Sequence, residues 1–211
     1  MHKFIFNGKF YNYFKHEYNK TYTNDRAVEI PLSFEVIKKH KNILEVGNVL
    51  SHYKRFKHDT VDLYEKAKGV INEDVRTYKT NKKYDLIISI STFEHIDETE
   101  GYGEKGILDA FENIRNLLTP NGTFFFTFPI GAHKDLDNLF INNKLGLKES
   151  YCMKRDLFDD YKFENNIWEQ CEISDIHSYK QHRCGFSYTS EKMDVCIGIG
   201  PRTMYLIIGK I

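Results

Sequence analysis

The sequence has no net charge, because 30 Lys and Arg residues offset 30 Asp and Glu residues over 211 positions. A chain without a basic excess lacks the broad positive field that attracts proteins to nucleic acid or to an anionic membrane surface. Its longest apolar runs, 86–88 and 124–126, fall far short of the ~18 residues that a membrane-spanning helix needs. The N-terminus has no apolar signal region. We therefore expect no nucleic-acid or membrane partner and a cytoplasmic location.

Cysteine is also scarce, and no two cysteines form a CxxC pair. Four cysteines could form disulfides, but without a secretion signal reduced thiols are the expected state. The spacing of His177, His182 and Cys184 is not that of a standard zinc site. We expect no metal. The four cysteines are Cys152, Cys171, Cys184 and Cys196.

The apolar residues instead form short runs that are typical of buried strands. Apolar residues on both faces of a strand are expected in a parallel sheet covered by helices. A helical apolar pattern at 106–118 lies between the fourth and fifth runs, and it ends at the turn 119–122. Strand, helix and strand in this order predict a right-handed crossover. The five runs are 43–46, 60–63, 69–72, 85–90 and 122–128.

The C-terminal residues show a different pattern. The runs 193–199 and 204–208 are separated by only four residues, 200–203, which is too short for a helical crossover. They predict an antiparallel hairpin. The fold class expected is therefore α/β, a three-layer Rossmann-like architecture with a seven-stranded, mostly parallel sheet closed by a C-terminal antiparallel hairpin.

The first part of the chain lacks these strand patterns. Residues 1–24 have weak periodicity and suggest an arm or a short helix, whereas 25–41 has apolar residues at helical spacing. Pro31 suits the first turn of a second helix that begins near Ile30. We expect residues 1–41 to form an N-terminal helical cap or lid on an α/β domain of residues 42–211.

Polar residues follow each predicted strand. Ligands of open α/β sheets bind beyond the carboxyl ends of the strands. Acids follow three consecutive strands, which indicates a ligand crevice at that edge of the sheet. These strand-end residues are Glu45, Gly47 and Asn48 after the first strand, Asp62 after the second, Asp74 and Val75 after the third, Ser91 and His95 after the fourth, and His133 after the fifth.

The motifs resemble those of the class I S-adenosylmethionine-dependent methyltransferases. Residues 45–47 match the start of that family's glycine-rich motif, and Asp62 matches its ribose-binding acid. Asp74 and Val75 match the residues beside the adenine. The segments 84–96 and 117–123 look like the fourth motif and the turn before strand five. The resemblance covers 43–128 and the closing hairpin.

The resemblance implies the cofactor S-adenosyl-L-methionine and a set of residues that bind it. These are Glu45, Gly47, Asn48, Asp62, Asp74, Val75 and Ser91, with Glu65 as a rival to Asp62 for the ribose. The sequence departs from the family at Val49 and Ser51, where further glycines are usual. Only 14 residues separate Gly47 from Asp62, so the first crossover helix must be very short.

Four residues are candidates for a role at the acceptor. His95 lies where an acceptor would meet the methyl group and suits a general base, although it could equally mark a structural helix start. Arg26 and Glu29, one helical turn apart, either form a surface ion pair or contribute to the acceptor site. His133 is a further candidate for acceptor contact.

The function expected is methyl transfer from S-adenosylmethionine to a small polar acceptor, such as a sugar or glycan precursor. The protein would act as a monomer or homodimer. A non-catalytic binding or scaffold module of the same fold is the main alternative. A nicotinamide-dependent oxidoreductase is a third hypothesis, but the sequence has no G-x-G-x-x-G motif.

Overall fold

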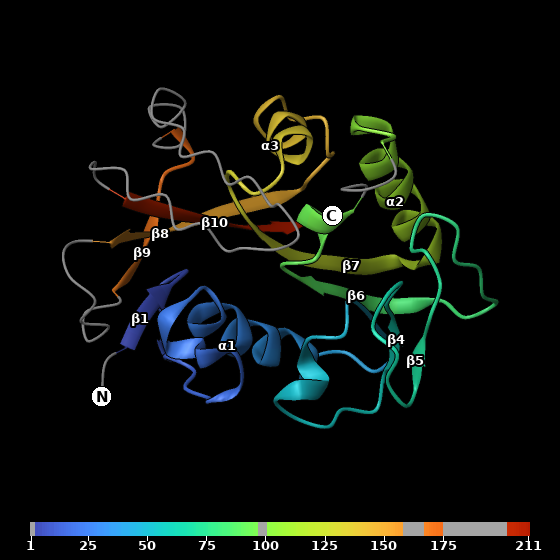
Figure 1. The fold of residues 1–211 in the computed structure, drawn as a ribbon, viewed down its shortest axis with the longest axis horizontal. Coiled ribbons are helices and arrows are strands. Elements are labelled where there is room, and N and C mark those ends of the chain that lie inside the picture. The colour runs from blue at the N-terminus through green and yellow to red at the C-terminus, as the bar shows by residue number, and fades with distance from the viewer. Residues whose placement is uncertain (1–2, 97–100, 158–166, 175–201) are drawn as a thin grey trace, which may run out of the picture.

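The protein has three layers, in which helices cover both faces of one long sheet (Figure 1). The computed structural model describes residues 3–96, 101–157, 167–174 and 202–211. The strands of the main sheet are β3 Ile43–Val46, β4 Asp59–Val61, β5 Val70–Ile71, β6 Tyr84–Ile90, β7 Leu118–Pro129, β8 Glu149–Leu157, β9 Trp168–Cys171 and β10 Arg202–Lys210.

The main sheet has the strand order β5-β4-β3-β6-β7-β10-β8-β9. The five strands from β5 to β7 run parallel, and β10, β8 and β9 continue the sheet as antiparallel strands. The predicted α/β class with a mostly parallel sheet is confirmed. The predicted number of seven strands is wrong, because β9 pairs with β8 and adds an eighth strand.

The C-terminal strand β10 lies inside the sheet. From residue 206 to 210 it pairs with β7 on one side and with β8 on the other, in both cases antiparallel. Its antiparallel direction agrees with the sequence prediction. The run 193–199, which we expected to be its hairpin partner, lies outside the described residues.

Alternate side chains of the central strands belong to two separate cores. Phe124, Phe126 and Phe128 of β7 pack with the helices α2 Glu104–Leu117 and α3 Lys134–Ile141, whereas Phe125 packs on the opposite face. Phe126 lies between its two neighbours on that face, with ring centroids 4.9 and 5.9 Å apart. This period of two is the strand pattern that a sheet covered on both faces requires.

The crossovers differ in length from one strand pair to the next. Helix α2 connects β6 to β7, as the helical pattern predicts. Between β3 and β4 only the 3₁₀ helix η2 Leu50–His52 forms, followed by an irregular segment. This short connection confirms the expectation drawn from the spacing of Gly47 and Asp62.

The N-terminal residues form a hairpin rather than a helix. Strands β1 Lys3–Phe6 and β2 Lys9–Asn12 pair antiparallel, and the 3₁₀ helix η1 Tyr18–Thr23 follows. Phe4 and Phe6 are buried in the same apolar cluster as Leu86 and Ile88 of β6. Residues 3–6 therefore alternate between exposed and buried positions as a strand does, whereas β2 is largely exposed and shows no such alternation.

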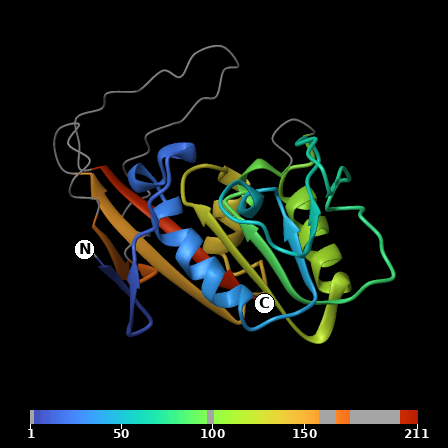
Figure 2. The same cartoon turned by 90° about the horizontal axis from the view of Figure 1, so that it is seen from below.

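A single helix, α1 Arg26–Ile37, crosses the sheet on the hairpin side (Figure 2). Pro31 lies inside this helix, so the expected break near Ile30 is absent. Proline cannot donate the hydrogen bond that the carbonyl of Ala27 would otherwise receive. The amide of Phe14 donates to that carbonyl instead, at 2.9 Å. The N-terminal arm thus supplies the donor that lets the helix continue through the proline.

Two further observations concern the expectations from composition. No helix in the described ranges is both long and apolar enough to cross a lipid bilayer. Cys152 is buried and Cys171 is partly buried, opposite each other on the neighbouring strands β8 and β9, and Cys184 and Cys196 lie outside the described residues.

Candidate active site

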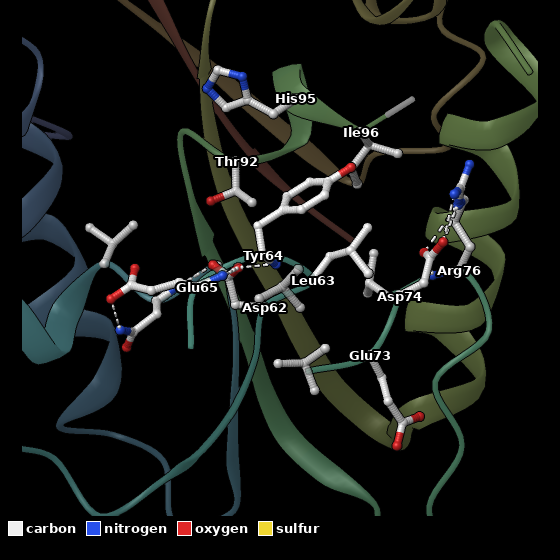
Figure 3. Close-up of a pocket in the computed structure, with 16 residues that line it drawn as sticks. Asp62, Leu63, Tyr64, Glu65, Glu73, Asp74, Arg76, Thr92, His95 and Ile96 are labelled. Carbon is white, nitrogen blue, oxygen red and sulfur yellow. Dashed lines mark hydrogen bonds and ion pairs between the residues drawn. The ribbon is translucent and has the colours of Figure 1, made fainter. Parts of the chain in front are cut away.

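A cavity of about 470 Å³ opens at the carboxyl ends of β3, β4 and β6 (Figure 3). Its volume lies within the ~300–1,000 Å³ range of small-molecule sites. The predicted strand-end residues Gly47, Asn48, Asp62, Asp74, Val75 and His95 all line it. The walls are formed by residues 46–49, 61–65 and 73–76 and by Thr92, His95 and Ile96.

Asp62 lies at the end of β4 with its carboxylate held by the backbone. One oxygen accepts hydrogen bonds from the amides of Tyr64 and Glu65, at 2.9 and 2.8 Å. The other oxygen accepts one from the amide of Asn48, at 3.0 Å. Burial alone would raise the pKa of Asp62, but these three donors lower it below its ordinary value. Asp62 is therefore an ionised acceptor, and the oxygen bonded to Asn48 has room for one more donor.

Glu65 is the second carboxylate on this wall. It accepts a hydrogen bond from the side-chain amide of Asn48 at 2.7 Å and lies 3.1 Å from the ring of His52. The hydroxyl of Ser51 donates to the other end of the Asn48 side chain, at 2.7 Å. Ser51, where the family usually has glycine, thus fixes a residue that lines the cavity.

Gly47 is held in the left-handed region, with φ of +86°. A Cβ atom on this residue would lie 2.2 Å from Oγ1 of Thr92. Both facts require glycine here. The close neighbour is a side chain of the segment that follows β6, so the strand-end loops of β3 and β6 are packed against each other at this residue.

Glu45 does not line the cavity and is fully buried behind it. Its Oε1 accepts hydrogen bonds from the amides of Val49 and Leu50, at 2.9 and 2.7 Å, and its Oε2 lies 2.6 Å from His58. The carboxylate therefore caps η2 from behind. The predicted contact of Glu45 with a cofactor stays a prediction. In the structure the loop residues whose amides it binds lie between Glu45 and the cavity.

The backbone of this loop has consequences for the ligand that it can accept. The three successive amides of residues 48–50 all donate to carboxylates, one to Asp62 and two to Glu45. A phosphate-binding loop needs such amides to be available to the phosphate. Here two negative groups already occupy them. The loop is suited to a ligand that is positive or zwitterionic at this point.

Asp74 and Arg76 form an ion pair on the opposite wall. Nε of Arg76 lies 3.0 and 2.8 Å from the two carboxylate oxygens, and a terminal nitrogen lies 2.6 Å from Oδ2. Burial would raise the pKa of Asp74, but these bonds lower it below its ordinary value. The guanidinium carbon lies 5.0 Å from the ring centroid of Tyr102. Beside this pair Val75 is buried against the cavity.

The rim of the cavity is formed by the residues after β6. Thr92 precedes the 3₁₀ helix η3 Phe93–His95 and His95 ends it, and the amide of His95 donates to the carbonyl of Thr92. In Figure 3 the ring of Tyr64 lies between Thr92 and Ile96, across the mouth of the cavity. The exposed imidazole of His95 lies at this rim.

Ser91, Arg26 and Glu29 lie together in a separate, more deeply buried cluster. The hydroxyls of Ser91 and Thr127 donate to Oε1 of Glu29, at 2.6 and 2.5 Å. Arg26 lies 2.5 Å from its other oxygen. The expected pairing of Arg26 with Glu29 is observed, but it is not at the surface, because both side chains are largely withdrawn from solvent beneath the arm and against β6 and β7. None of the three predicted residues lines the cavity.

His133 begins helix α3. Its Nδ1 accepts a hydrogen bond from the amide of Leu136, at 3.2 Å, which caps the helix. It does not line the cavity. Its predicted contact with an acceptor stays a prediction. The contact that the structure shows is the cap on α3.

The sequence analysis missed three residues that the structure brings to the site. Arg76 and Thr92 line the cavity, and Glu94 is buried just behind the rim. The signal for Arg76 was its position two residues after Asp74, where the chain turns back. Glu94 was treated only as part of a motif, and nothing in a single sequence distinguishes a buried acid from an exposed one at a strand end.

No protein-family model and no curated protein matches the chain. Among solved structures, the N-methyltransferase NodS from Bradyrhizobium japonicum is similar over 88% of this chain and 95% of its own, with 11% identity and a TM-score of 0.44. An S-adenosylmethionine-dependent methyltransferase from Thermotoga maritima aligns over 80% of each chain, with 13% identity and a TM-score of 0.43.

A third similar structure, a methyltransferase from Clostridium acetobutylicum, aligns over 84% of this chain and 88% of its own, with 14% identity and a TM-score of 0.36. Other alignments span less of the matched structure, down to 43% for DesVI of Streptomyces venezuelae. Similarities this low assign no activity. They assign no family either, and the strand order and strand directions given above stand on the chain's own sheet.

Proposed function

We propose that the protein transfers a methyl group from S-adenosylmethionine to a small polar acceptor. The observation that carries the proposal is the pairing of the loop amides of residues 48–50 with Asp62 and Glu45. That pairing disfavours a phosphate and favours a ligand that carries a positive charge and hydroxyl groups. S-adenosylmethionine has both, and when bound it supplies a methyl group on a positively charged sulfur.

The cavity residues fit this cofactor by their chemistry. The remaining acceptor position of Asp62 and the carboxylate of Glu65 would receive the ribose hydroxyls. Asp74 and Val75 on the opposite wall would border the adenine, with Asp74 accepting from its amino group. Gly47 and Asn48 would border the methionine part, while Glu45 and Ser91 would act only through the loops that they hold.

The contribution of the protein to the transfer would be mainly alignment and the exclusion of water. Tyr64 lies across the mouth and would shield the bound ligand. His95 at the rim would accept a proton from a hydroxyl acceptor, because histidine is the side chain that most often acts as a general base. Replacement of His95 by Gln would then lower kcat and leave cofactor affinity unchanged.

Two other functions are distinguished by simple measurements. A non-catalytic module of this fold would bind the cofactor without transferring its methyl group. An oxidoreductase would bind NAD, which the occupied loop amides disfavour.

The test is isothermal titration of the full chain with S-adenosylmethionine, S-adenosylhomocysteine and NAD. We expect binding of the first two, saturable at micromolar to sub-millimolar concentration, and no binding of NAD. Absence of binding at millimolar S-adenosylhomocysteine would overturn the proposal. Release of S-adenosylhomocysteine in the presence of small polar acceptors would then separate the enzyme from the binding module.

A further inference from the structure

Two cysteines lie opposite each other near one edge of the main sheet. Cys152 belongs to β8 and Cys171 to β9, and the two residues are direct partners in the antiparallel register of these strands. Cys152 is fully buried, whereas Cys171 is partly exposed. Neither residue lines the cavity. The proposed methyl transfer therefore makes no use of either side chain.

Both cysteine side chains lie on the same face of the sheet. Directly opposite residues of an antiparallel pair always share a face. Cys152 belongs to the apolar cluster that packs with α2 and α3, and Cys171 packs against the same cluster. Met153, the next residue on β8, and Trp168, three positions before Cys171, belong to the cluster on the other face. The alternation along both strands therefore brings the two sulfur atoms together on one side.

The spacing of such a pair suits a disulfide. Directly opposite Cα atoms of antiparallel strands are about 4.5 or 5.5 Å apart, and a disulfide joins Cα atoms that are about 4.4–6.8 Å apart. Strand β9 is the last strand of the sheet and, among the described strands, pairs only with β8. A small shift of β9 toward β8 would therefore break no ladder on its other side.

The two cysteines differ in what can reach them. A reagent in solution can approach Cys171, because its side chain is partly exposed. Cys152 is closed to solvent, and its opposite neighbour on β9 is Cys171. The apolar surroundings of the pair also suit the product, because a disulfide buries no charge there.

We propose that Cys152 and Cys171 form an oxidative modification site, at which a small disulfide such as oxidised glutathione converts the two thiols into one intramolecular disulfide. The observation that carries the proposal is their direct pairing across β8 and β9 on one face of the sheet. The site lies apart from the cavity and is independent of the proposed function.

The conversion takes two exchange steps. The thiolate of Cys171, formed by loss of its proton to water, attacks one sulfur of oxidised glutathione, whose S–S bond breaks and releases one glutathione thiolate. Cys152 then attacks Sγ of Cys171, and the bond from Cys171 to glutathione breaks. The proton of Cys152 passes to the second departing thiolate, and the first thiolate recovers a proton from water. The protein thus loses two electrons, which oxidised glutathione gains.

The disulfide would fix the strand on which the N-terminal arm rests. The amide of Trp168 donates to the hydroxyl of Tyr13 at 2.8 Å, and the amide of Asn7 donates to Oε1 of Gln170 at 2.9 Å. The new bond would close a loop of residues 153–170 and constrain the unfolded chain. We expect oxidation to raise the midpoint of thermal unfolding by about 5–10 °C.

The test begins with the full-length chain in buffers of increasing ratio of oxidised to reduced glutathione, followed by peptide mapping without reductant. We expect a cross-linked peptide that joins Cys152 to Cys171, with two fewer reactive thiols, and reversal by dithiothreitol. A stable glutathione adduct on Cys171 without the cross-link would overturn the proposal. So would a cross-link from either residue to Cys184 or Cys196, or no reaction of the pair.

Variants separate the two steps. Cys152→Ala should accumulate the glutathione adduct on Cys171, because the second thiol is missing. Cys171→Ala should leave Cys152 unmodified, because that side chain is buried. Modification of Cys152 in this variant would overturn the assignment of steps.

The matched control is Cys184→Ser/Cys196→Ser, which keeps only the proposed pair. It should form the same cross-link and show the same rise in the unfolding midpoint on oxidation. No rise, or an equal rise in Cys171→Ala, would show that the bond does not fix β9.

Discussion

The acids that line the cavity differ from the acids beneath α1 in the partners that the chain gives them. Asp62 and Asp74 receive several N–H donors each, and these donors lower their pKa values against the effect of burial. Asp25 and Glu94 lie among other acids, and burial raises their pKa values. Asp62 and Asp74 are therefore ionised without a ligand and can accept hydrogen bonds from hydroxyl or amino groups. Asp25 and Glu94 lie where burial and neighbouring acids both favour the protonated carboxyl.

The comparison also shows how one fold can place acids in two different surroundings a few residues apart. On the cavity side, the backbone itself supplies the donors, because the turn after β4 directs two amides at one carboxylate oxygen. Beneath α1 the acids come from segments far apart in sequence, α1 and η3. Among the described residues none donates to Oε2 of Glu94.

The largest expected effect comes from removing the cavity carboxylate. Asp62→Ala deletes the acceptor of three backbone amides, so we expect a loss of about 2–4 kcal/mol in the free energy of unfolding. Affinity for S-adenosylhomocysteine should fall by about 10- to 100-fold. Urea denaturation and isothermal titration measure the two effects.

The matched control for this variant is Glu73→Gln, at an exposed position of the cavity wall. It should change stability and affinity little. Equal losses in the two variants would mean that the backbone donors do not distinguish Asp62 from its neighbours.

The next largest effect concerns the contact between the two regions. Gly47→Ala places a Cβ against Thr92 in a backbone conformation that disfavours side chains. We expect a destabilisation of about 2–3 kcal/mol, from strain and displacement of Thr92. Thermal or urea unfolding measures it.

A second substitution tests the cause of that loss. Thr92→Ala removes the two atoms nearest to the new Cβ and should restore part of the stability of Gly47→Ala. The φ strain of residue 47 should remain. If the loss of stability in the double variant equals the sum of the losses in the two single variants, the contact with Thr92 does not cause the destabilisation by Gly47→Ala.

A smaller effect of opposite sign is expected at Glu94. Because its pKa is raised in the folded protein, the folded state binds more protons than the unfolded state above pH ~4.3, and stability falls as pH rises. Glu94→Gln removes this loss and should stabilise the protein by about 1–3 kcal/mol at pH 8. Near pH 4 the variant and the parent should have equal stability. A destabilised variant at pH 8 would show that the carboxylate has a partner after all.

The smallest effect is expected at Asp74, whose side chain is partly exposed. Its lowered pKa contributes stability that is present above its ordinary pKa of about 4 and is lost as pH falls through the folded value. Asp74→Asn should cost about 0.5–1 kcal/mol at pH 7 and progressively less below pH 4. Urea denaturation at both pH values gives the difference. A constant cost at all pH values would assign the effect to packing.

Much of the fold could be predicted because it depends on local patterns. The apolar runs after residue 42 indicate strands of a parallel sheet covered on both faces. The helical spacing of 106–118 indicates the crossover helix between two of them. The N-terminal hairpin was missed because four-residue strands rich in Lys, Asn and aromatics have weak periodicity. The continuous helix through Pro31 was missed because its compensating donor, Phe14, comes from another segment.

The site was predicted in outline and not in its contacts. Acids at strand ends pointed to the cavity, and six of the predicted residues line it. Sequence position could not show that Glu45 is turned toward His58, or that Ser91 is held by Glu29. These contacts depend on side chains from elements that lie 13 and 62 positions away in the chain. Glu94 was missed for the same reason.

The clash that a Cβ at position 47 would meet has a consequence for comparing related sequences. Thr92 alone is enough to require glycine there, whether or not anything occupies the cavity. A descendant of this chain that had lost all affinity for nucleosides would therefore keep the same residue for as long as the neighbouring threonine persisted. A glycine at that one position in a related sequence therefore records how two loops are packed and is not a marker of a working pocket.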